Sequence, residues 1–117
     1  MPSDLTTTVL QAQDTHAVVA VSGAMDYDST GALYDLLISL IDEGRQHLML
    51  EMSQVGFCDS SGLNTLLQAL RRARARQGSL VLVAPTATLQ RVLEITEVDA
   101  VLPQYPDVAA ALLALLA

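Results

Sequence analysis

The sequence predicts a single α/β domain, in which a mixed, mostly parallel β-sheet of about four to five strands packs against about four α-helices. The chain has 117 residues, of which 51% are hydrophobic, and this suits one core while leaving no room for a second domain. Short β-patterned runs alternate with longer runs of helical spacing, and this alternation favours parallel strand pairing. No repeat, low-complexity tract or linker interrupts it.

Two β-patterned runs open the chain. Residues 5–13 alternate loosely between apolar and polar side chains, and HAVVAVSG, residues 16–23, is a compact β-rich run. Gly23 is expected to end the second run. The two runs together predict a hairpin.

A helix and a buried strand should follow. Ser29 is a good N-cap, and Gly44 is expected to end the helical pattern. The apolar positions of this helix are Leu33, Leu37, Leu40 and Ile41. HLMLEM, residues 47–52, then reads as a short strand buried on both faces, so its Glu51 must lie at an edge or be paired.

The second helix has the clearest pattern in the chain. It begins near Ser60 and should stop at Gly78. Its apolar positions are Leu63, Leu66, Leu67 and Leu70. SLVLVA, residues 79–84, supplies another buried strand, which Pro85 ends.

The last third of the chain predicts two further helices around an edge strand. Thr86 or Thr88 can cap the third helix. Its apolar positions are Leu89, Val92, Leu93 and Ile95. VLPQY is a brief strand that Pro103 limits to an edge, and Asp107 opens the last helix. That helix should be buried through Val108, Leu112, Leu113 and Leu116.

The charge balance argues against nucleic acid and anionic membranes as partners. There are 13 acidic and 6 basic residues, a net charge of -7. Four arginines fall within residues 71–76, but at 100° per residue they fan around the helix, and cations are favourable at its negative end. No signal peptide or membrane-length apolar run is evident, and the lone Cys58 cannot form an internal disulfide. We therefore expect a cytoplasmic protein.

GFCDSSGLNTLL, residues 56–67, places an aspartate and two serines between apolar residues and the start of a helical pattern. Asp59, Ser60, Ser61 and Gly62 fall in the strand-to-helix turn. Free backbone N–H groups and the helix dipole there favour a carboxylate or a phosphate. Asp59 or Ser60 alone could cap the helix, so capping does not explain the second hydroxyl, nor Gly62, which weakens the first turn.

A strand-to-helix turn is also where hydrolases expose a nucleophilic serine. The GxSxG pattern is absent, however, and His16 and His47 each begin a predicted strand without a local partner motif. Both histidines fit strand-end residues better than a catalytic base, so no catalytic residue is expected.

A phospho-accepting aspartate is a further alternative, because Asp26, Asp28 and Asp59 could hold a magnesium ion as receiver domains do. Receiver domains rely on a lysine near the phosphoryl group, and this chain contains none. We therefore expect these carboxylates to serve as ordinary caps and turns, with no metal site.

The chain resembles a STAS domain of the bacterial anti-sigma factor antagonist family over nearly its full length, so residues 1–117 are expected to form one such domain. The resemblance rests on VSGAMDYDST, on MLEMSQVGFCDSSGLNTLL and on LVLVAPTATLQRVLEITEVDAVLPQYPDVAAAL. DSSGL after a hydrophobic strand is specific in this context. Cys58 stands where the family often has a hydrophobic residue, and a reduced cysteine packs as a small hydrophobe.

The resemblance implies a phosphorylation switch at Ser60, which leaves Ser61 available as a helix cap. The unphosphorylated protein would bind a serine/threonine kinase that is also the anti-sigma factor, and so release a sigma factor. Phosphorylation would end this binding, and a serine phosphatase would reset Ser60. The partner-binding residues would be Asp26, Asp59, Ser60, Ser61, Gly62 and Asn64.

The same resemblance implies a protein that is not an enzyme and has no cofactor of its own, since ATP and Mg²⁺ would belong to the kinase. The alternative within this family is a STAS accessory subunit of a transport ATPase or a stress-sensing assembly, without a sigma switch.

Overall fold

A five-stranded sheet with four α-helices forms the domain in the computed structural model, which describes residues 5–116. The elements are β1 (Thr6–Ala12), β2 (His16–Met25), α1 (Thr30–Asp42), β3 (His47–Cys58), α2 (Ser60–Ala75), β4 (Ser79–Val83), α3 (Ala87–Ile95), a 3₁₀ turn (Val98–Ala100), β5 (Gln104–Tyr105) and α4 (Val108–Leu116). The strands lie in chain order, with β1 antiparallel to β2 and the other three pairs parallel. The predicted fold class and hairpin are confirmed. Of the predicted domain 1–117, residues 1–4 and 117 lie outside the described residues.

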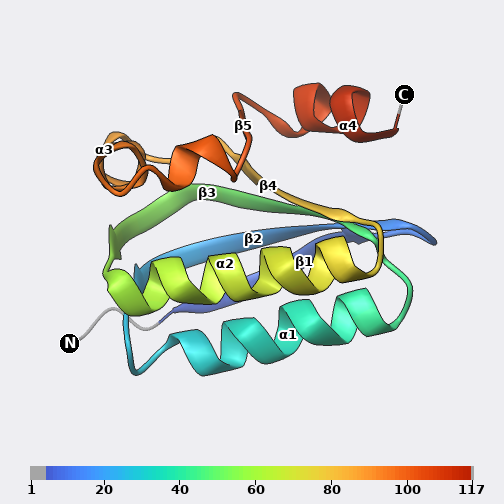
Figure 1. Ribbon diagram of the computed structural model, residues 1–117, viewed down its shortest axis with the longest axis horizontal. Helices are drawn as coiled ribbons and strands as arrows, with labels where there is room; N and C mark the ends of the chain where they lie inside the picture. The colour runs from blue at the N-terminus through green and yellow to red at the C-terminus, as the bar shows by residue number, and fades with distance from the viewer. Residues whose placement is uncertain (1–4, 117) are drawn as a thin grey trace.

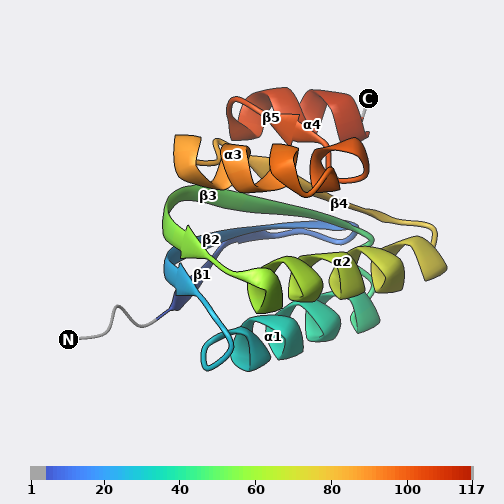
Figure 2. The same ribbon diagram turned by 60° about the vertical axis from the view of Figure 1, so that its left-hand side comes forward.

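Helices cover both faces of the sheet. The helices α1 and α2 lie side by side on one face, whereas α3 and α4 lie on the other side of β3 and β4 (Figures 1 and 2). The larger hydrophobic cluster joins the sheet to α1 and α2, and Leu89 and Leu93 of α3 also belong to it. A smaller cluster places Ala111 of α4 against Val18, Met49 and Val81.

Two strands run further than the sequence pattern predicted. Gly23 does not end β2: it has a φ of 107° and lies beside a register shift, and the strand continues to Met25. The strand β3 continues past residue 52 to Cys58, although polar residues and a glycine interrupt its apolar pattern. Glu51 is not at an edge, since β3 pairs with β2 and β4, and its carboxylate accepts hydrogen bonds from Ser53. Beyond Glu51, β3 pairs with β2 alone, so the carboxyl-terminal ends of β2 and β3 extend beyond the end of β4.

The ends of α2 and α3 show how the predicted stop and start signals act. The helix α2 ends at Ala75, before the predicted Gly78, and Gln77 takes up the left-handed conformation with a φ of 62°. Gly78 is needed for another reason: a Cβ there would lie 1.9 Å from the Gln46 carbonyl oxygen. The cap of α3 is confirmed as Thr86, whose side chain accepts a hydrogen bond from the Leu89 N–H.

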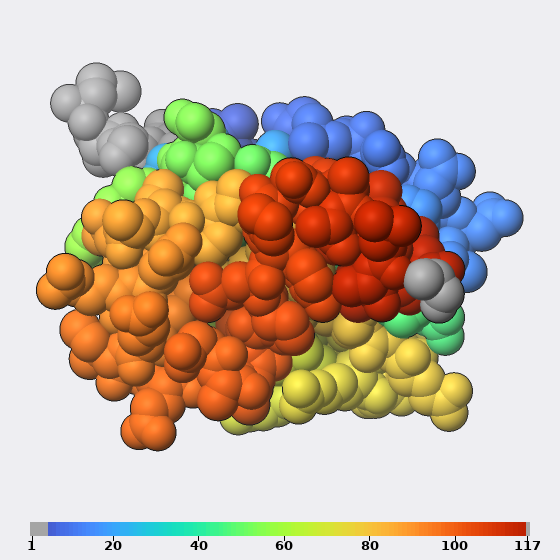
Figure 3. All heavy atoms as spheres, turned by 90° about the horizontal axis from the view of Figure 1, so that it is seen from above, coloured from blue at the N-terminus to red at the C-terminus, as the bar shows by residue number. Residues whose placement is uncertain are grey.

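The C-terminal helix is less buried than its leucines suggested. Asp107 opens α4 as predicted, accepting a hydrogen bond from the Ala110 N–H at 2.8 Å. Leu113 is 72% exposed and Leu116 42% exposed, which corrects the expectation that both are buried. Ile95, an apolar position of α3, is likewise 74% exposed. Figure 3 shows α4, in red, on the surface beside the blue β1–β2 hairpin, where it is free to present one side to solvent.

The arginine cluster contributes to packing between helix ends. The Asp42 carboxylate at the end of α1 lies 3.0 Å from Arg72 and 3.1 Å from Arg76. Arg72 and Arg74 occupy the last turn of α2, where the helix dipole favours cations. These exposed pairs are worth little individually, and they give Arg72 and Arg76 a partner within the domain.

Candidate functional site

The β3–α2 turn and the β2–α1 loop meet at one edge of the sheet. Met25 and Cys58 are register partners at the ends of two parallel strands, and the Asp59 N–H donates to the Met25 carbonyl oxygen at 3.1 Å. Asp26 and Asp59, each the residue after its strand, are therefore neighbours although they are far apart in the sequence. The structure brings together the two segments that carry the predicted partner-binding residues.

Asp59 caps α2. Its extended backbone has φ -98° and ψ -171°, and its carboxylate accepts a hydrogen bond from the Gly62 N–H at 3.0 Å. Within residues 5–116, neither the Ser60 nor the Ser61 hydroxyl has a hydrogen-bond partner, so of the three candidate caps it is Asp59, and not Ser60 or Ser61, that caps the helix. The carboxylate takes that role because it already reaches the third N–H of the helix.

The two serines differ in their access to solvent. Ser60 is exposed as the first residue of α2, whereas Ser61 is half-buried. Asn64 is exposed one turn further along the same helix. Ser60 is thus the more accessible hydroxyl of the pair, and it needs no rearrangement of the cap to react.

Gly62 permits the start of α2 to lie close to the end of β2. A Cβ at this position would lie 2.7 Å from the Met25 carbonyl oxygen and 2.8 Å from the Cys58 sulfur. Real Cβ atoms essentially never approach other atoms so closely. Close packing between the turn and the strand therefore explains the glycine that capping left unexplained.

The β2–α1 loop is held by its own hydrogen bonds. The Asp26 carboxylate accepts from the backbone N–H groups of Asp28 and Ser29, both at 3.1 Å. The Ser29 hydroxyl donates to the Ala24 carbonyl oxygen at 2.8 Å and accepts from the Asp26 N–H at 2.9 Å. Ser29 occupies the N-cap position of α1, but its hydroxyl forms hydrogen bonds within the loop instead of capping the helix. Asp26 and Asp59 thus have the predicted roles of turn and cap.

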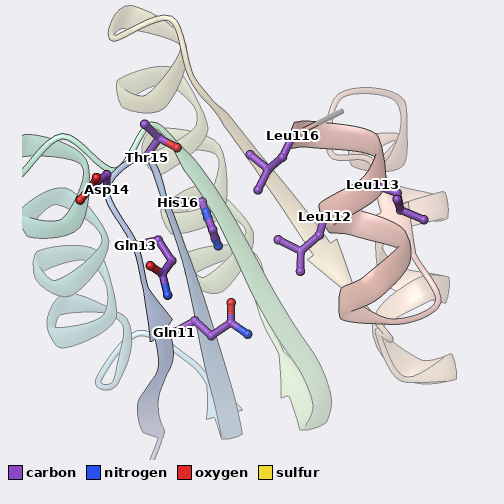
Figure 4. Close-up of a pocket in the computed structure, with 8 residues that line it drawn as sticks. All are labelled: Gln11, Gln13, Asp14, Thr15, His16, Leu112, Leu113 and Leu116. Atoms are coloured by element: carbon purple, nitrogen blue, oxygen red, sulfur yellow. The ribbon is translucent and has the colours of Figure 1, made fainter.

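Both histidines lie at the opposite end of the sheet from Ser60. His16 and His47 begin β2 and β3 and are register partners, and His47 Nδ1 lies 2.8 Å from the Ser79 hydroxyl. The fold therefore brings neither imidazole to Ser60 or Ser61. An open hollow of about 790 Å³ lies at this same end, between the β1–β2 turn and the leucines of α4 (Figure 4).

Cys58 lies in the hydrophobic core directly beneath the turn. Burial, and secondarily the negative charge of Asp59, raises the pKa of its thiol to about 11. The protonated side chain packs as a small apolar group. The buried position of Cys58 agrees with its predicted packing role, and it places an uncharged side chain beneath the site.

The Cys58 thiol should make folding stability sensitive to alkaline pH. Its pKa is about 11 in the folded chain against an ordinary value of 9.0 in an unfolded one. The folded state therefore holds the proton more tightly, so its stabilising effect is complete below about pH 9 and is lost as the pH rises through 11. We expect the Tm advantage of the native chain over Cys58→Ala, measured in a reducing buffer, to narrow from pH 8 to pH 11. A pH-independent difference would contradict this.

The site is acidic. The ion pairs within residues 5–116 involve the carboxylates of Glu43 and Asp42, and neither lies at this edge. The arginines of α2 begin at Arg71, eleven residues after Ser60, which is about 16 Å along a helix axis. An anion added at Ser60 would meet the first backbone N–H groups of α2 and the Asp59 carboxylate, with none of these arginines beside it.

Comparison with known proteins identifies one family. The STAS domain model matches residues 7–111. The crystal structure of an anti-sigma factor antagonist from Mycobacterium paratuberculosis is similar over 100% of this chain and 98% of its own, with a TM-score of 0.87 and 28% sequence identity.

Within the described residues, no helix combines the length and apolar character needed to cross a membrane.

More distant structures share the fold. The anti-sigma factor antagonist SpoIIAA in its unphosphorylated form has a TM-score of 0.80 at 17% identity, covering 93% of this chain and 96% of its own. The Bacillus SpoIIAA in its phosphorylated form has a TM-score of 0.68 at 16% identity, covering 85% and 90%. The murine anion transporter Slc26a9 has a TM-score of 0.74 at 16% identity, but the similarity covers 96% of this chain and 22% of the transporter.

Proposed function

The chain belongs to the STAS domain family, and on that premise we propose that it is an anti-sigma factor antagonist switched off by phosphorylation of Ser60. The unphosphorylated form binds a serine/threonine kinase that is also the anti-sigma factor, and thereby releases a sigma factor. A serine phosphatase restores the active form. The chain is then a cytoplasmic STAS domain over residues 1–117 that acts as a ligand and not as an enzyme, with ATP and Mg²⁺ supplied by the kinase.

The exposed Ser60 hydroxyl is the observation that carries this proposal. It stands at the first position of α2 without a hydrogen-bond partner in the described chain, while Asp59 caps the helix. A kinase can therefore reach the hydroxyl without breaking the cap. The similarity to the Mycobacterium paratuberculosis antagonist over the whole chain supports the same class of partner.

The free protein can accommodate a phosphate at Ser60. The Asp59 carboxylate accepts a hydrogen bond from the Gly62 N–H, and the Asp59 carbonyl oxygen accepts one from the Leu63 N–H. The N–H groups of Ser60 and Ser61 therefore remain available at the helix end. Those groups and the helix dipole favour an anion. Modification should therefore leave the fold intact.

Within a complex, the same phosphate is unfavourable. Phosphoryl transfer requires the Ser60 hydroxyl to face the terminal phosphate of the nucleotide on the kinase, so a phosphoserine then meets anionic phosphates with about -1.5 to -2 charges of its own. The neighbouring Asp59 carboxylate adds to the repulsion. Of the predicted partner-binding residues, the proposed surface uses Asp26, Asp59, Ser60, Ser61 and Asn64. Gly62 is buried and contributes by letting α2 lie close to the end of β2.

Ser60→Ala is expected to abolish phosphorylation while leaving kinase binding largely intact, because the variant removes an exposed hydroxyl and changes no contact within the protein. The kinase is first captured from native lysate on the immobilised wild-type chain, and phosphate incorporation with ATP and Mg²⁺ is followed by mass spectrometry. Ser61→Ala is the matched control and should still gain one phosphate. Phosphate found on Ser61 alone would refute the assignment.

The identity of the captured partner tests the function class. A serine kinase in the eluate is expected. A transport ATPase recovered without a kinase would favour the accessory-subunit alternative and would contradict the sigma switch.

A further inference from the structure

Two aromatic side chains are exposed next to the proposed phosphorylation site. Tyr27 is 81% exposed and Phe57 is 53% exposed, in a chain that contains one phenylalanine and three tyrosines. Aromatic side chains carry a large apolar surface that folding normally buries. These two side chains are exposed instead, and packing within the fold does not account for their exposure.

Both aromatics lie at the meeting point of the two loops. Phe57 is the register partner of Ala24 and precedes Cys58, and Tyr27 follows Met25 by two residues. The hydrogen bond from the Asp59 N–H to the Met25 carbonyl oxygen fixes these segments to one another. At about 3.3 Å per extended residue, each aromatic backbone position lies within about 7 Å of that bond along the chain. Together with Ser60 they lie at the same edge of the sheet, and these three residues, Tyr27, Phe57 and Ser60, are here called the aromatic edge.

The carboxylates around the aromatic edge have no cationic partner within residues 5–116. Asp26 and Asp59 bond to backbone N–H groups, and the ion pairs of the described chain lie elsewhere. Asp28 is exposed next to Tyr27. The edge thus combines apolar anchors with a negative rim, a pattern that a partner surface of apolar pockets bordered by lysine or arginine would complement.

We infer, on the basis of the proposed function, that Tyr27 and Phe57 are the principal anchors for the anti-sigma factor kinase. Interface energy concentrates in a few aromatic residues that enter desolvated pockets, with charged contacts at the rim. Cationic groups of the kinase meet Asp26 and Asp28 at the rim, while Ser60 lies inside the water-excluded contact beside Phe57. A phosphate on Ser60 is placed in the apolar part of the interface, so one modification disrupts the whole surface.

The test measures the affinity of the kinase captured by the wild-type chain for purified Tyr27→Ala and Phe57→Ala. Each variant should bind at least about tenfold more weakly, as expected for a hot-spot truncation. Leu113→Ala is the matched control, because it removes a side chain of similar exposure from α4, near His16 at the opposite end of the sheet from Ser60, and should bind like the wild type. All three should keep the wild-type Tm, since each side chain is exposed.

The outcomes separate this inference from the function on which it rests. If Ser60 is phosphorylated and the wild type binds the kinase, but both aromatic variants bind within about twofold of it, the anchor role is wrong and the proposed function stands. If the wild type binds no kinase and Ser60 gains no phosphate, the proposed function and the anchor role both fail. Weaker wild-type binding at higher salt, with a smaller salt effect in Asp28→Asn, would support the cationic rim, and an absence of salt dependence would refute it.

Discussion

Ser60→Asp is expected to weaken binding of the anti-sigma factor kinase about 100-fold. The carboxylate would stand in a desolvated contact, beside Asp59 and opposite the phosphates of the kinase-bound nucleotide. A penalty of about 3 kcal/mol corresponds to that change, since about 1.4 kcal/mol is a factor of ten. Titration calorimetry with the captured kinase and a bound nucleotide measures the dissociation constant directly. True phosphoserine, with more charge, should bind at least as weakly.

Two matched variants separate charge from size and from position. Ser60→Asn adds similar bulk without charge, and we expect it to lose much less affinity than Ser60→Asp. Gln68→Glu adds one negative charge at an exposed position two turns further along α2, away from the turn, and should bind like the wild type. If Ser60→Asn were as damaging as Ser60→Asp, bulk and not charge would operate the switch. Tighter binding of the phosphorylated chain would refute the proposed direction of the switch.

The periodicity of the apolar residues was enough to predict the architecture. One face of α2 is buried through Leu63, Leu66 and Leu70, as their spacing required. The buried strands before and after this helix, β3 and β4, pair in parallel. The hairpin at the start of the chain was also readable, because its two runs show the period of a strand. Such local patterns decide which elements form and which face each one buries.

Contacts between distant segments could not be read in the same way. The exposed Leu113 and Leu116 show the limit, since an apolar helix pattern does not reveal how much sheet remains for α4 to cover. Gly62 looked like a costly residue in the first helical turn, and its reason appears once Met25 and Cys58 are beside it. The capping role of Asp59 was one of several open choices, because three neighbouring residues could each supply an oxygen. At the site, motif resemblance singled out Ser60, while the exposed Tyr27 and Phe57 left no periodic signal.

Gly78→Ala is expected to have the largest effect on folding stability of any single methyl addition considered. The new Cβ would lie 1.9 Å from the Gln46 carbonyl oxygen and 2.6 Å from its carbonyl carbon, and backbone atoms cannot rotate away as a side chain can. The same oxygen accepts a hydrogen bond from the Ser79 N–H at 2.9 Å, where β3 and β4 begin to pair. Relief of the overlap must therefore separate β3 from β4 or break that bond. We expect a loss of roughly 3 kcal/mol or more, as for severe overpacking.

Chemical denaturation with urea, followed by circular dichroism, measures this loss, and Gly31→Ala provides the control. Gly31 is the second residue of α1 and has no atom within 4 Å of an added Cβ, so the same methyl group should stabilise the helix slightly, by less than the roughly 0.5–1 kcal/mol of a helix-interior position. The two substitutions are chemically identical, and opposite signs would isolate the steric contact at Gln46 as the cause. An unchanged urea midpoint for Gly78→Ala would mean that β3 and β4 can shift apart at little cost in stability. Close packing would then not explain Gly62 either, because its overlaps with Met25 and Cys58 are smaller.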